Sequence, residues 1–441
     1  MHRAHAFWRM ASAASRRAMD SMRASNAATV GSLMAGAGLA SAAAYGMSPL
    51  QLGASFGASK AKEARVETQV YTWGSGVHGQ LGHGSQVVSQ SSPTLVEALQ
   101  DVEVVDLSAG YVSSAALSAD GRVWTFGGGT GAKLGHGYSM NVPNETVPRV
   151  VEGLSGVQVK QLSVGGTHMA AVDSNGHVWS WGDPHFGQLG HRNEQKGFPN
   201  RVDTAHFGGA RVAQVSAGKS HTCAVTESGE VYTWGNGREY ALGHGTRSNV
   251  TVPTKVKGVE NVVAVACGSD FTLALTKDGK LYSWGADSYG QLGHGALEKY
   301  QKTPKMVSTL RSESLVAVAA GEFHGLALTS GGAVYSWGFG AHGQCGHGDR
   351  SDHRVPKAIE TLRAMPATAV AAGGGHSACI TADGKLWMFG KGRTGQLGRG
   401  DALESVGSNR MSPVPVPYFD GHKLLCVRLG SDHTAALVTK S

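Results

Sequence analysis

The chain has 441 residues, of which 64 are glycine and 7% are aromatic, a composition that favours many tight turns between short strands over long packed helices. Its net charge of +7 is uneven, because residues 1–66 carry +6 and the rest of the chain carries only +1. A folded region so close to neutral gives little support to nucleic-acid binding, which needs clustered Lys and Arg to neutralise phosphates.

The first segment of the chain has the composition of a mitochondrial transit peptide. Five arginines, the first at Arg3 and the last at Arg23, are scattered among Ala, Ser and Met, and Asp20 is the only acid in the first 26 residues. A secretory signal would instead gather its charge directly before the apolar stretch. We therefore predict a transit peptide over residues 1–26 and a mitochondrial location.

A run without charged residues follows the arginines. Its apolar centre, residues 27–47, is just long enough to cross a bilayer as a helix. Much of this centre is Ala and Gly, whose transfer energies are small, so an import linker is the alternative interpretation. We predict a transmembrane helix over residues 27–47 that anchors the protein in the inner membrane, and a linker over residues 48–68.

From residue 69 to the C-terminus the sequence repeats itself. An aromatic residue followed by glycine recurs seven times, at intervals of 50 to 55 residues, at Trp73-Gly74, Phe126-Gly127, Trp181-Gly182, Trp234-Gly235, Trp284-Gly285, Trp337-Gly338 and Phe389-Gly390. Eight residues after each aromatic comes a Leu, or once Cys345, inside a phrase similar to Gly-Gln-Leu-Gly-His-Gly. No insertion disturbs that offset in any copy.

A second marker, glycine followed three residues later by histidine and a short apolar run, also occurs once per unit. Five copies keep the histidine, and two variants end in Ser113 and Phe271. An Asp-Gly turn flanked by β-forming residues, such as Asp278-Gly279, separates this marker from the next aromatic-glycine pair, which is a hairpin signature. About four strands in each unit of roughly 50 residues predict an all-β seven-bladed propeller over residues 69–441.

The phase of the two markers predicts how the ring closes. The first aromatic-glycine pair, at Trp73, has no second marker before it, and the last second marker, ending at His433, has no aromatic-glycine pair after it. The two half-units are therefore expected to complete one blade, which removes exposed sheet edges.

These phrases resemble the regulator-of-chromosome-condensation repeat family, and the resemblance covers about 370 residues in seven matching units. It implies a seven-bladed propeller. It also implies a range of activities, since propellers of this family serve as nucleotide exchange factors, inhibitors, ubiquitin-ligase modules and scaffolds, and a fold does not fix a function.

The residues in the middle of the second marker differ from unit to unit, and such turns lie together on one face of a propeller. Five of these residues are candidates for binding a partner: Tyr111, Lys219, Asp270, Glu322 and Asp432.

Other motifs have structural interpretations. The histidines fall one per repeat, so they stand in separate blades and cannot converge on one metal ion. The five cysteines are far apart and include no C-x-x-C pair, which indicates small buried strand residues. Stretches matching Gly-x-Gly-x-x-Gly, as at Gly74, lead into another repeat phrase and not into the helix that a dinucleotide needs. We therefore expect no catalytic residues, no cofactor and no metal site.

In the family's nuclear member, guanine nucleotide exchange on a small GTPase uses acidic and histidine loop residues together with an inserted wedge. Asp270, Glu322 and Asp432 would supply such loop residues here, but the identical offsets leave no room for a wedge. The resemblance therefore gives this kind of exchange activity little support.

With its leader, the chain resembles the mitochondrial members of the family. We predict a non-catalytic scaffold, anchored in the inner membrane through residues 27–47, that acts in assembly of a respiratory chain complex and binds its subunits or assembly factors. One alternative is a guanine nucleotide exchange factor for a mitochondrial dynamin-like GTPase. Another is a factor for mitochondrial ribosome or RNA maturation, although nucleic acid is not the expected partner.

Overall fold

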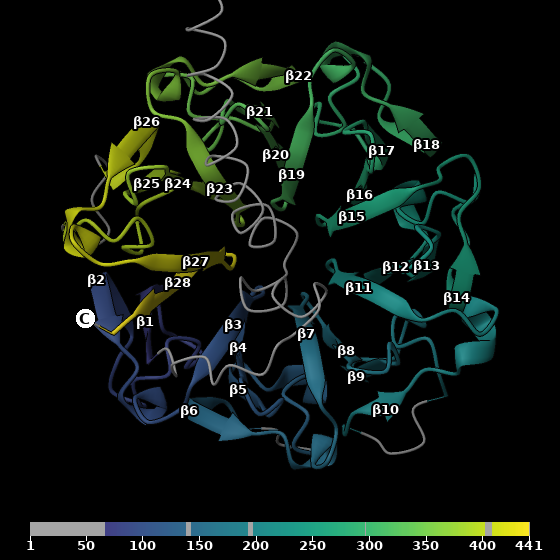
Figure 1. The fold of residues 1–441 in the computed structure, drawn as a ribbon, viewed down its shortest axis with the longest axis horizontal. Coiled ribbons are helices and arrows are strands. Elements are labelled where there is room, and N and C mark those ends of the chain that lie inside the picture. Colours follow the sequence, from purple (N-terminus) through teal and green to yellow (C-terminus); the bar gives the residue numbers. More distant parts are fainter. Residues whose placement is uncertain (1–66, 138–142, 193–196, 296, 402–407, 441) are drawn as a thin grey trace, which may run out of the picture.

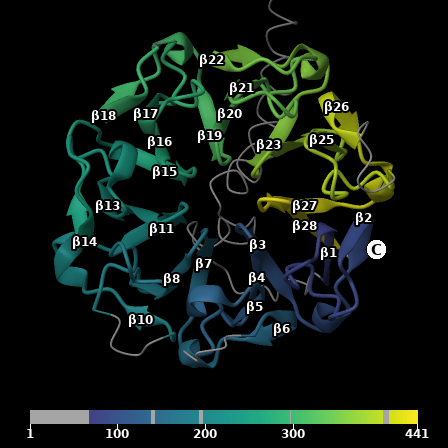
Figure 2. The ribbon, with the colours of Figure 1, turned by 180° about the vertical axis from the view of Figure 1, so that it is seen from behind.

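A computed structural model describes residues 67–137, 143–192, 197–295, 297–401 and 408–440. They form seven four-stranded antiparallel sheets arranged around a central axis, as the two opposite views show (Figures 1 and 2). The predicted all-β, seven-bladed propeller is confirmed. The predicted transit peptide, membrane helix and most of the linker lie outside the described residues. Within the described part of the chain, no helix is long and apolar enough to cross a membrane.

Each blade is numbered here in ring order and given from its innermost to its outermost strand. Blade 1 contains β27 (Leu424–Leu429), β28 (His433–Thr439), β1 (Thr68–Ser75) and β2 (Ser89–Leu95); blade 2 contains β3 (Val104–Ala109), β4 (Ser113–Ser118), β5 (Val123–Gly127) and β6 (Glu145–Val150); blade 3 contains β7 (Val159–Val164), β8 (His168–Asp173), β9 (Val178–Gly182) and β10 (Asn200–Arg201). Blade 4 contains β11 (Val212–Ala217), β12 (His221–Thr226), β13 (Val231–Gly235) and β14 (Val250–Lys255); blade 5 contains β15 (Val262–Cys267), β16 (Phe271–Thr276), β17 (Leu281–Ala286) and β18 (Tyr300–Met306). Blade 6 contains β19 (Leu315–Ala320), β20 (His324–Thr329), β21 (Val334–Gly338) and β22 (His353–Ala358); blade 7 contains β23 (Ala367–Ala372), β24 (His376–Thr381), β25 (Leu386–Gly390) and β26 (Arg410–Pro415).

Short 3₁₀ helices occupy many of the connections between strands. They are η3 (Glu97–Leu99), η4 (Thr130–Ala132), η5 (Glu152–Leu154), η6 (Thr204–Phe207), η7 (Arg238–Tyr240), η8 (Ser308–Leu310), η9 (Glu360–Leu362) and η11 (Pro417–Phe419). Those that lead from an outer strand to the next blade each bury one large apolar side chain, such as Leu310 of η8. These side chains help to fill the space between neighbouring sheets.

Blade 1 is built from both ends of the described chain, as the two half-units predict. Strand β1 pairs with β28 in antiparallel register from Thr68 opposite Thr439 to Gly74 opposite His433. Because this pairing joins the first strand to the last, neither strand is left as an exposed sheet edge.

The second strand of every blade is buried along its length, as β20 shows at all of its positions, with Thr439 at the end of β28 as the one partly buried residue. This follows from the architecture, because each sheet packs against a neighbouring sheet on both faces and the second strand lies between the channel-lining inner strand and the third strand. The aromatic of each first marker fills these interfaces and is bonded across them in several blades. The indole Nε1 of Trp284, for example, donates to the carbonyl of Ala241 in the preceding blade (2.9 Å).

The histidines of the second marker also join neighbouring blades. Each is buried, with its Nε2 within 3.2 Å of a hydroxyl in the next blade, in the pairs His433–Ser114, His168–Thr222, His221–Thr272, His324–Ser377 and His376–Thr434. The same hydroxyl also donates a hydrogen bond to a main-chain carbonyl, as Thr222 does to the carbonyl of Gln188 (2.8 Å). Each of these histidines therefore makes a polar contact between two blades.

Candidate partner-binding face

One face of the propeller carries two sets of loops, and we call it the loop face. The inner turns connect the first strand of each blade to the second and contain the second marker, and the neighbouring loops follow each aromatic-glycine pair. The two sets touch within a blade, since the amide of Phe339 donates to the carbonyl of Phe323 (2.9 Å). All five predicted binding residues lie on the inner turns, but the structure gives them different surroundings.

Two contacts cross the mouth of the central channel at this face. The hydroxyl of Tyr111, in blade 2, donates to Ser269 Oγ of blade 5 (3.1 Å), and Ser431 Oγ of blade 1 donates to Glu322 of blade 6 (2.7 Å). Burial raises the pKa of Tyr111, and the charges of Glu322 and Asp270 act in the same direction. Tyr111, Asp270 and Glu322 therefore belong to one polar group at the end of the channel.

The other two predicted residues stand apart from that group. Asp432 forms an ion pair with Lys391 (2.7 Å) and accepts a hydrogen bond from Gln396 (3.2 Å), so its carboxylate is held by blade 7. Lys219 lies exposed on the inner turn of blade 4. The five residues are thus one channel-mouth group, one ion pair and one exposed lysine, and not a single cluster.

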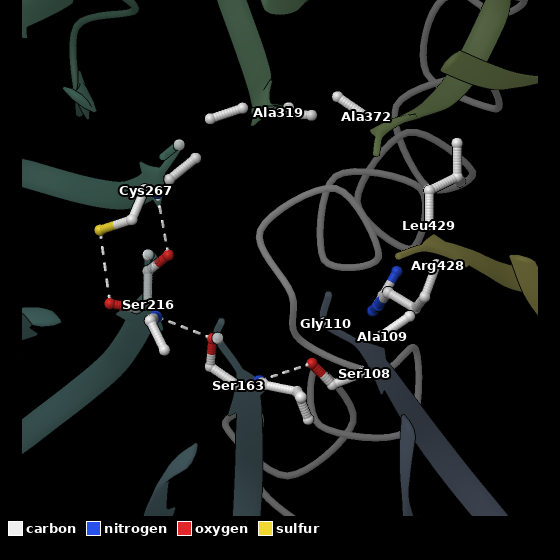
Figure 3. Close-up of a pocket in the computed structure, with 18 of the residues that line it drawn as sticks. Ser108, Ala109, Gly110, Ser163, Ser216, Cys267, Ala319, Ala372, Arg428 and Leu429 are labelled. Carbon is white, nitrogen blue, oxygen red and sulfur yellow. Dashed lines mark hydrogen bonds between the residues drawn. The ribbon is translucent and has the colours of Figure 1, made fainter. Parts of the chain in front are cut away.

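Below the mouth lies a cavity of about 230 Å³, lined by the inner strands of all seven blades (Figure 3). Polar side chains join the inner strands on one side of it. The amide of Gln161 exchanges two hydrogen bonds with the main chain of Val215 (3.0 and 3.1 Å), and Arg428 pairs with Asp106 (2.8 Å). On the opposite side the wall is built from small residues such as Ala319 and Ala372.

An aromatic cluster on the loop face, with one exposed and three partly buried rings, escaped the sequence analysis. It spans blades 5 and 6 and consists of Tyr289, Phe323, Phe339 and His342. Tyr289 lies 4.7 Å from Phe339 and 5.6 Å from Phe323, measured between ring centroids, and it is 37% exposed. Aligning the repeats would have shown large rings at loop positions where most units carry small or polar residues.

Charged groups surround this aromatic cluster. Burial lowers the pKa of His342, and the positive charges of Lys391 and Arg393 lower it further, which places a basic edge on the blade 7 side. Glu322 precedes Phe323 and supplies negative charge toward the channel. An apolar centre with a charged rim is the arrangement of protein-binding hot spots, in which a few aromatic side chains carry most of the binding energy.

In the part of the chain that the structure describes, no group of three or more His, Cys, Asp or Glu side chains is placed to hold a metal ion. The loop face offers hydrogen bonds, charge and aromatic surface to a partner.

A buried lysine marks the boundary between blades 2 and 3. Five blades place a glutamine in their Gly-Gln-Leu-Gly phrase, and its side-chain oxygen accepts an amide hydrogen within its own loop, as Gln188 does from Phe186 (2.9 Å). Blade 2 has Lys133 there, only 4% exposed, with its Nζ 3.3 Å from the carbonyl of Gly166. Burial lowers the pKa of Lys133 to about 8.

Replacing Lys133 by Gln is expected to stabilise the protein by about 2 kcal/mol at pH 7. Below pH 8 the amine is charged in both states and the folded protein bears the cost of burying it. The pKa of lysine in the unfolded chain is about 10.5. As the pH rises from 8 toward that value, folding no longer requires a buried charge, so the stability gained by the Gln variant should shrink. Chemical denaturation of both proteins at pH 7 and pH 10 measures this change.

Lys133→Met is the matched control, since it removes the charge without restoring the amide. The Met variant should show the same pH dependence of its added stability as the Gln variant. It should lack the part of that stability that comes from the hydrogen bond of the Gln amide. An equal gain at both pH values would show that the buried charge is not the cause.

Comparisons with known proteins agree with this architecture. A family model described as "RCC1-like domain" matches residues 69–436. The Arabidopsis thaliana ultraviolet-B receptor UVR8 is 35% identical over 374 residues, which cover 84% of this chain and 71% of that protein. The mitochondrial RCC1 domain-containing protein RUG3 of Arabidopsis thaliana is 34% identical over 410 residues, covering 85% of this chain and 90% of that protein.

Larger proteins contain the same unit. The human E3 ubiquitin-protein ligase HERC2 is 36% identical over 375 residues, but the match spans only 8% of its length. Among solved structures, Prp20p from Saccharomyces cerevisiae superposes with a TM-score of 0.75 at 24% identity, covering 86% of this chain and 93% of that one. Human WBSCR16 gives a TM-score of 0.73 at 25% identity, covering 85% and 100%. The likeness to Prp20p concerns the fold alone.

Proposed function

Because this chain belongs to the RCC1-like domain family, whose propellers bind other proteins, we propose that it is a non-catalytic scaffold that binds a protein partner through the aromatic cluster on the loop face. The observation that carries the proposal is the packing of the exposed ring of Tyr289 against the partly buried rings of Phe323 and Phe339, beside groups of both charges. Pre-packed rings lose little entropy on binding and offer a large apolar contact, so they suit an anchor for a partner.

The proposed location is the mitochondrion. The arginine-rich composition of residues 1–26 supports it, and so does similarity over most of the chain to RUG3, whose name describes it as mitochondrial. We propose further that residues 27–47 anchor the protein in the inner membrane and that the propeller takes part in assembly of a respiratory chain complex. This finer role rests on the apolar leader segment and on a binding face that needs no active site.

A second candidate function is nucleotide exchange on a mitochondrial dynamin-like GTPase. The carboxylates of Asp270 and Glu322, grouped with Tyr111 at the channel mouth, are the observation that favours it. Replacing Asp270 and Glu322 together by Ala tests this candidate, because loss of accelerated nucleotide release by a folded variant would support it. The third role, in ribosome or RNA maturation, is not supported by the net charge of the propeller, which is close to zero.

Replacing Tyr289 and Phe323 together by Ala is expected to reduce partner recovery at least tenfold, because truncating central aromatic anchors commonly costs 2 kcal/mol or more. The measurement is affinity purification of the tagged full-length protein from detergent-solubilised mitochondria, with mass spectrometry of the bound proteins. Carbonate extraction of the same membranes tests the anchor.

Phe186→Ala is the control for this experiment. Phe186 lies on the same face in blade 3 and is equally exposed at 37%, but it is outside the aromatic cluster. Recovery of respiratory subunits or assembly factors by the wild type and by Phe186→Ala, but not by the double variant, supports the scaffold. A GTPase or ribosomal proteins among the bound proteins would favour one of the alternatives, and equal recovery by all three proteins would refute binding through the cluster.

A further inference from the structure

The boundary between blades 4 and 5 brings two thiols and an imidazole together beside the central channel. Cys267 ends the inner strand β15 and lines the cavity (Figure 3), with its Sγ 3.4 Å from the carbonyl oxygen of Ser216. It packs against the buried apolar cluster that contains Cys223 of β12. His221 begins the same strand as Cys223, so all three side chains meet at one interface.

This arrangement is specific to one blade boundary. The Nδ1 atoms of His168, His324, His376 and His433 are buried without a hydrogen-bond partner among the described residues. In the blade that follows each of these histidines, the residue before the marker glycine is apolar: Ala217, Ala372, Leu429 or Ala109. After His221 that residue is Cys267, and the imidazole and the sulfur form a side-chain hydrogen bond.

The charges follow from this contact. Burial acts to raise the pKa of Cys267, but the Cys223 thiol and the His221 imidazole outweigh it and hold that pKa well below its usual range. Burial acts to lower the pKa of His221, yet the charge of Cys267 raises it above the ordinary value. The pKa of Cys223 is raised well above normal by burial and by Cys267. These directions favour ionisation of Cys267 over ionisation of Cys223.

We propose that Cys267 is a peroxide-reactive thiol and that Cys223 is its resolving partner, so that oxidation forms a disulfide joining blades 4 and 5. The geometry supports this assignment, because Cys267 is partly exposed in the wall of a cavity that admits a small oxidant, whereas Cys223 is fully buried. The inference is independent of the proposed partner and of the aromatic cluster.

The reaction balances with hydrogen peroxide as the oxidant. The Cys267 thiolate attacks one peroxide oxygen, the O–O bond breaks, and the leaving hydroxide takes the proton held by His221, which gives a sulfenic acid and water. The Cys223 sulfur then attacks the Cys267 sulfur and displaces hydroxide, which takes the Cys223 proton and leaves as a second water. Loss of negative charge at Cys267 in the first step removes one cause of the raised Cys223 pKa.

The other cysteines supply internal controls. Burial raises the pKa values of Cys345 and Cys379 to about 12 and that of Cys426 to about 11. Thiols that remain protonated and buried react slowly with peroxide. Selective oxidation should therefore spare these three residues in the folded protein.

The test treats the purified protein with hydrogen peroxide at pH 7.5, alkylates the remaining thiols after denaturation, and maps the peptides by mass. We expect a Cys223–Cys267 disulfide, unmodified Cys345, Cys379 and Cys426, and a melting temperature higher by about 5 °C. In Cys223→Ser, dimedone should trap a sulfenic acid at Cys267.

His221→Phe is the positioning control, because blade 5 already carries Phe271 at the equivalent position and the replacement suits the fold. It should slow oxidation of Cys267 at least about tenfold while the melting temperature of the reduced protein stays close to that of the wild type. The proposal fails if Cys267 oxidises no faster than Cys379 in the native protein. It also fails if no Cys223–Cys267 disulfide forms, or if the His221→Phe variant reacts at the wild-type rate.

Discussion

A protein carrying Gly338→Val is expected to lose more than about 4 kcal/mol of stability and to be recovered largely as aggregate. Gly338 ends β21 with a φ of +99°, and a Cβ there would lie 2.5 Å from the carbonyl oxygen of Phe323 and 2.7 Å from the Cα of His324. Both obstacles are backbone atoms, one at the end of the inner turn and one at the start of β20, so no side-chain movement can relieve them. Thermal unfolding followed by circular dichroism, with soluble yield, measures the loss.

The control separates close packing from backbone strain. Gly384 has a similar φ of +83°, but an added Cβ would meet nothing within 4 Å. Gly384→Ala is therefore expected to cost only about 1 kcal/mol, the ordinary penalty for a left-handed residue with a side chain. Gly338→Ala should cost several times more. Equal losses at the two positions would show that the approach of β20 to β21 is looser than described.

Removing residues 430–441 is expected to abolish cooperative unfolding of the whole propeller. This deletion takes away β28, which pairs with both β1 and β27 in blade 1. Two apolar clusters lose buried members of that strand, among them Ala436 and Leu437. With blade 1 reduced to the β1–β2 pair and an isolated β27, β1 presents an unpaired edge and the packing of blade 1 against blades 7 and 2 is disrupted. Calorimetry and size-exclusion chromatography should show a broad or absent transition and oligomers.

The matched deletion removes only residues 440 and 441. Lys440 makes an ion pair with Glu67 in which both side chains are at least half exposed, so its loss should leave the melting temperature unchanged. A cooperative transition near the wild-type temperature in the longer deletion would mean that six blades close without the seventh.

The repeat made the fold predictable in unusual detail. A constant offset from Trp73 to Leu81, repeated in each unit, fixed the number of blades, and the phase of the markers at Trp73 and His433 predicted the pairing of β1 with β28. Such inferences succeed because each unit repeats the same local contacts, so periodic sequence maps directly onto periodic structure.

The site was less predictable, since its contacts do not follow the period. Tyr111 and Ser269 meet across the channel although 158 residues separate them, and no repeat pattern tells which side chain reaches across. Cys223 and Cys267 were expected to be separate buried residues. The two cysteines occupy non-equivalent positions in neighbouring repeats, since one is in the second strand of blade 4 and the other in the first strand of blade 5. Only the packing of one sheet on the next brings them together.

The composite blade also dictates an order of events as the chain is made. Strand β1 emerges from the ribosome first among the strands, but its partner β28 emerges last, after all six other blades have left the exit tunnel. Domains usually begin to fold from the N-terminus during synthesis. Here the earliest strand must wait with one edge unsatisfied until the last strand of the propeller has emerged, so ring closure follows the synthesis of all seven blades.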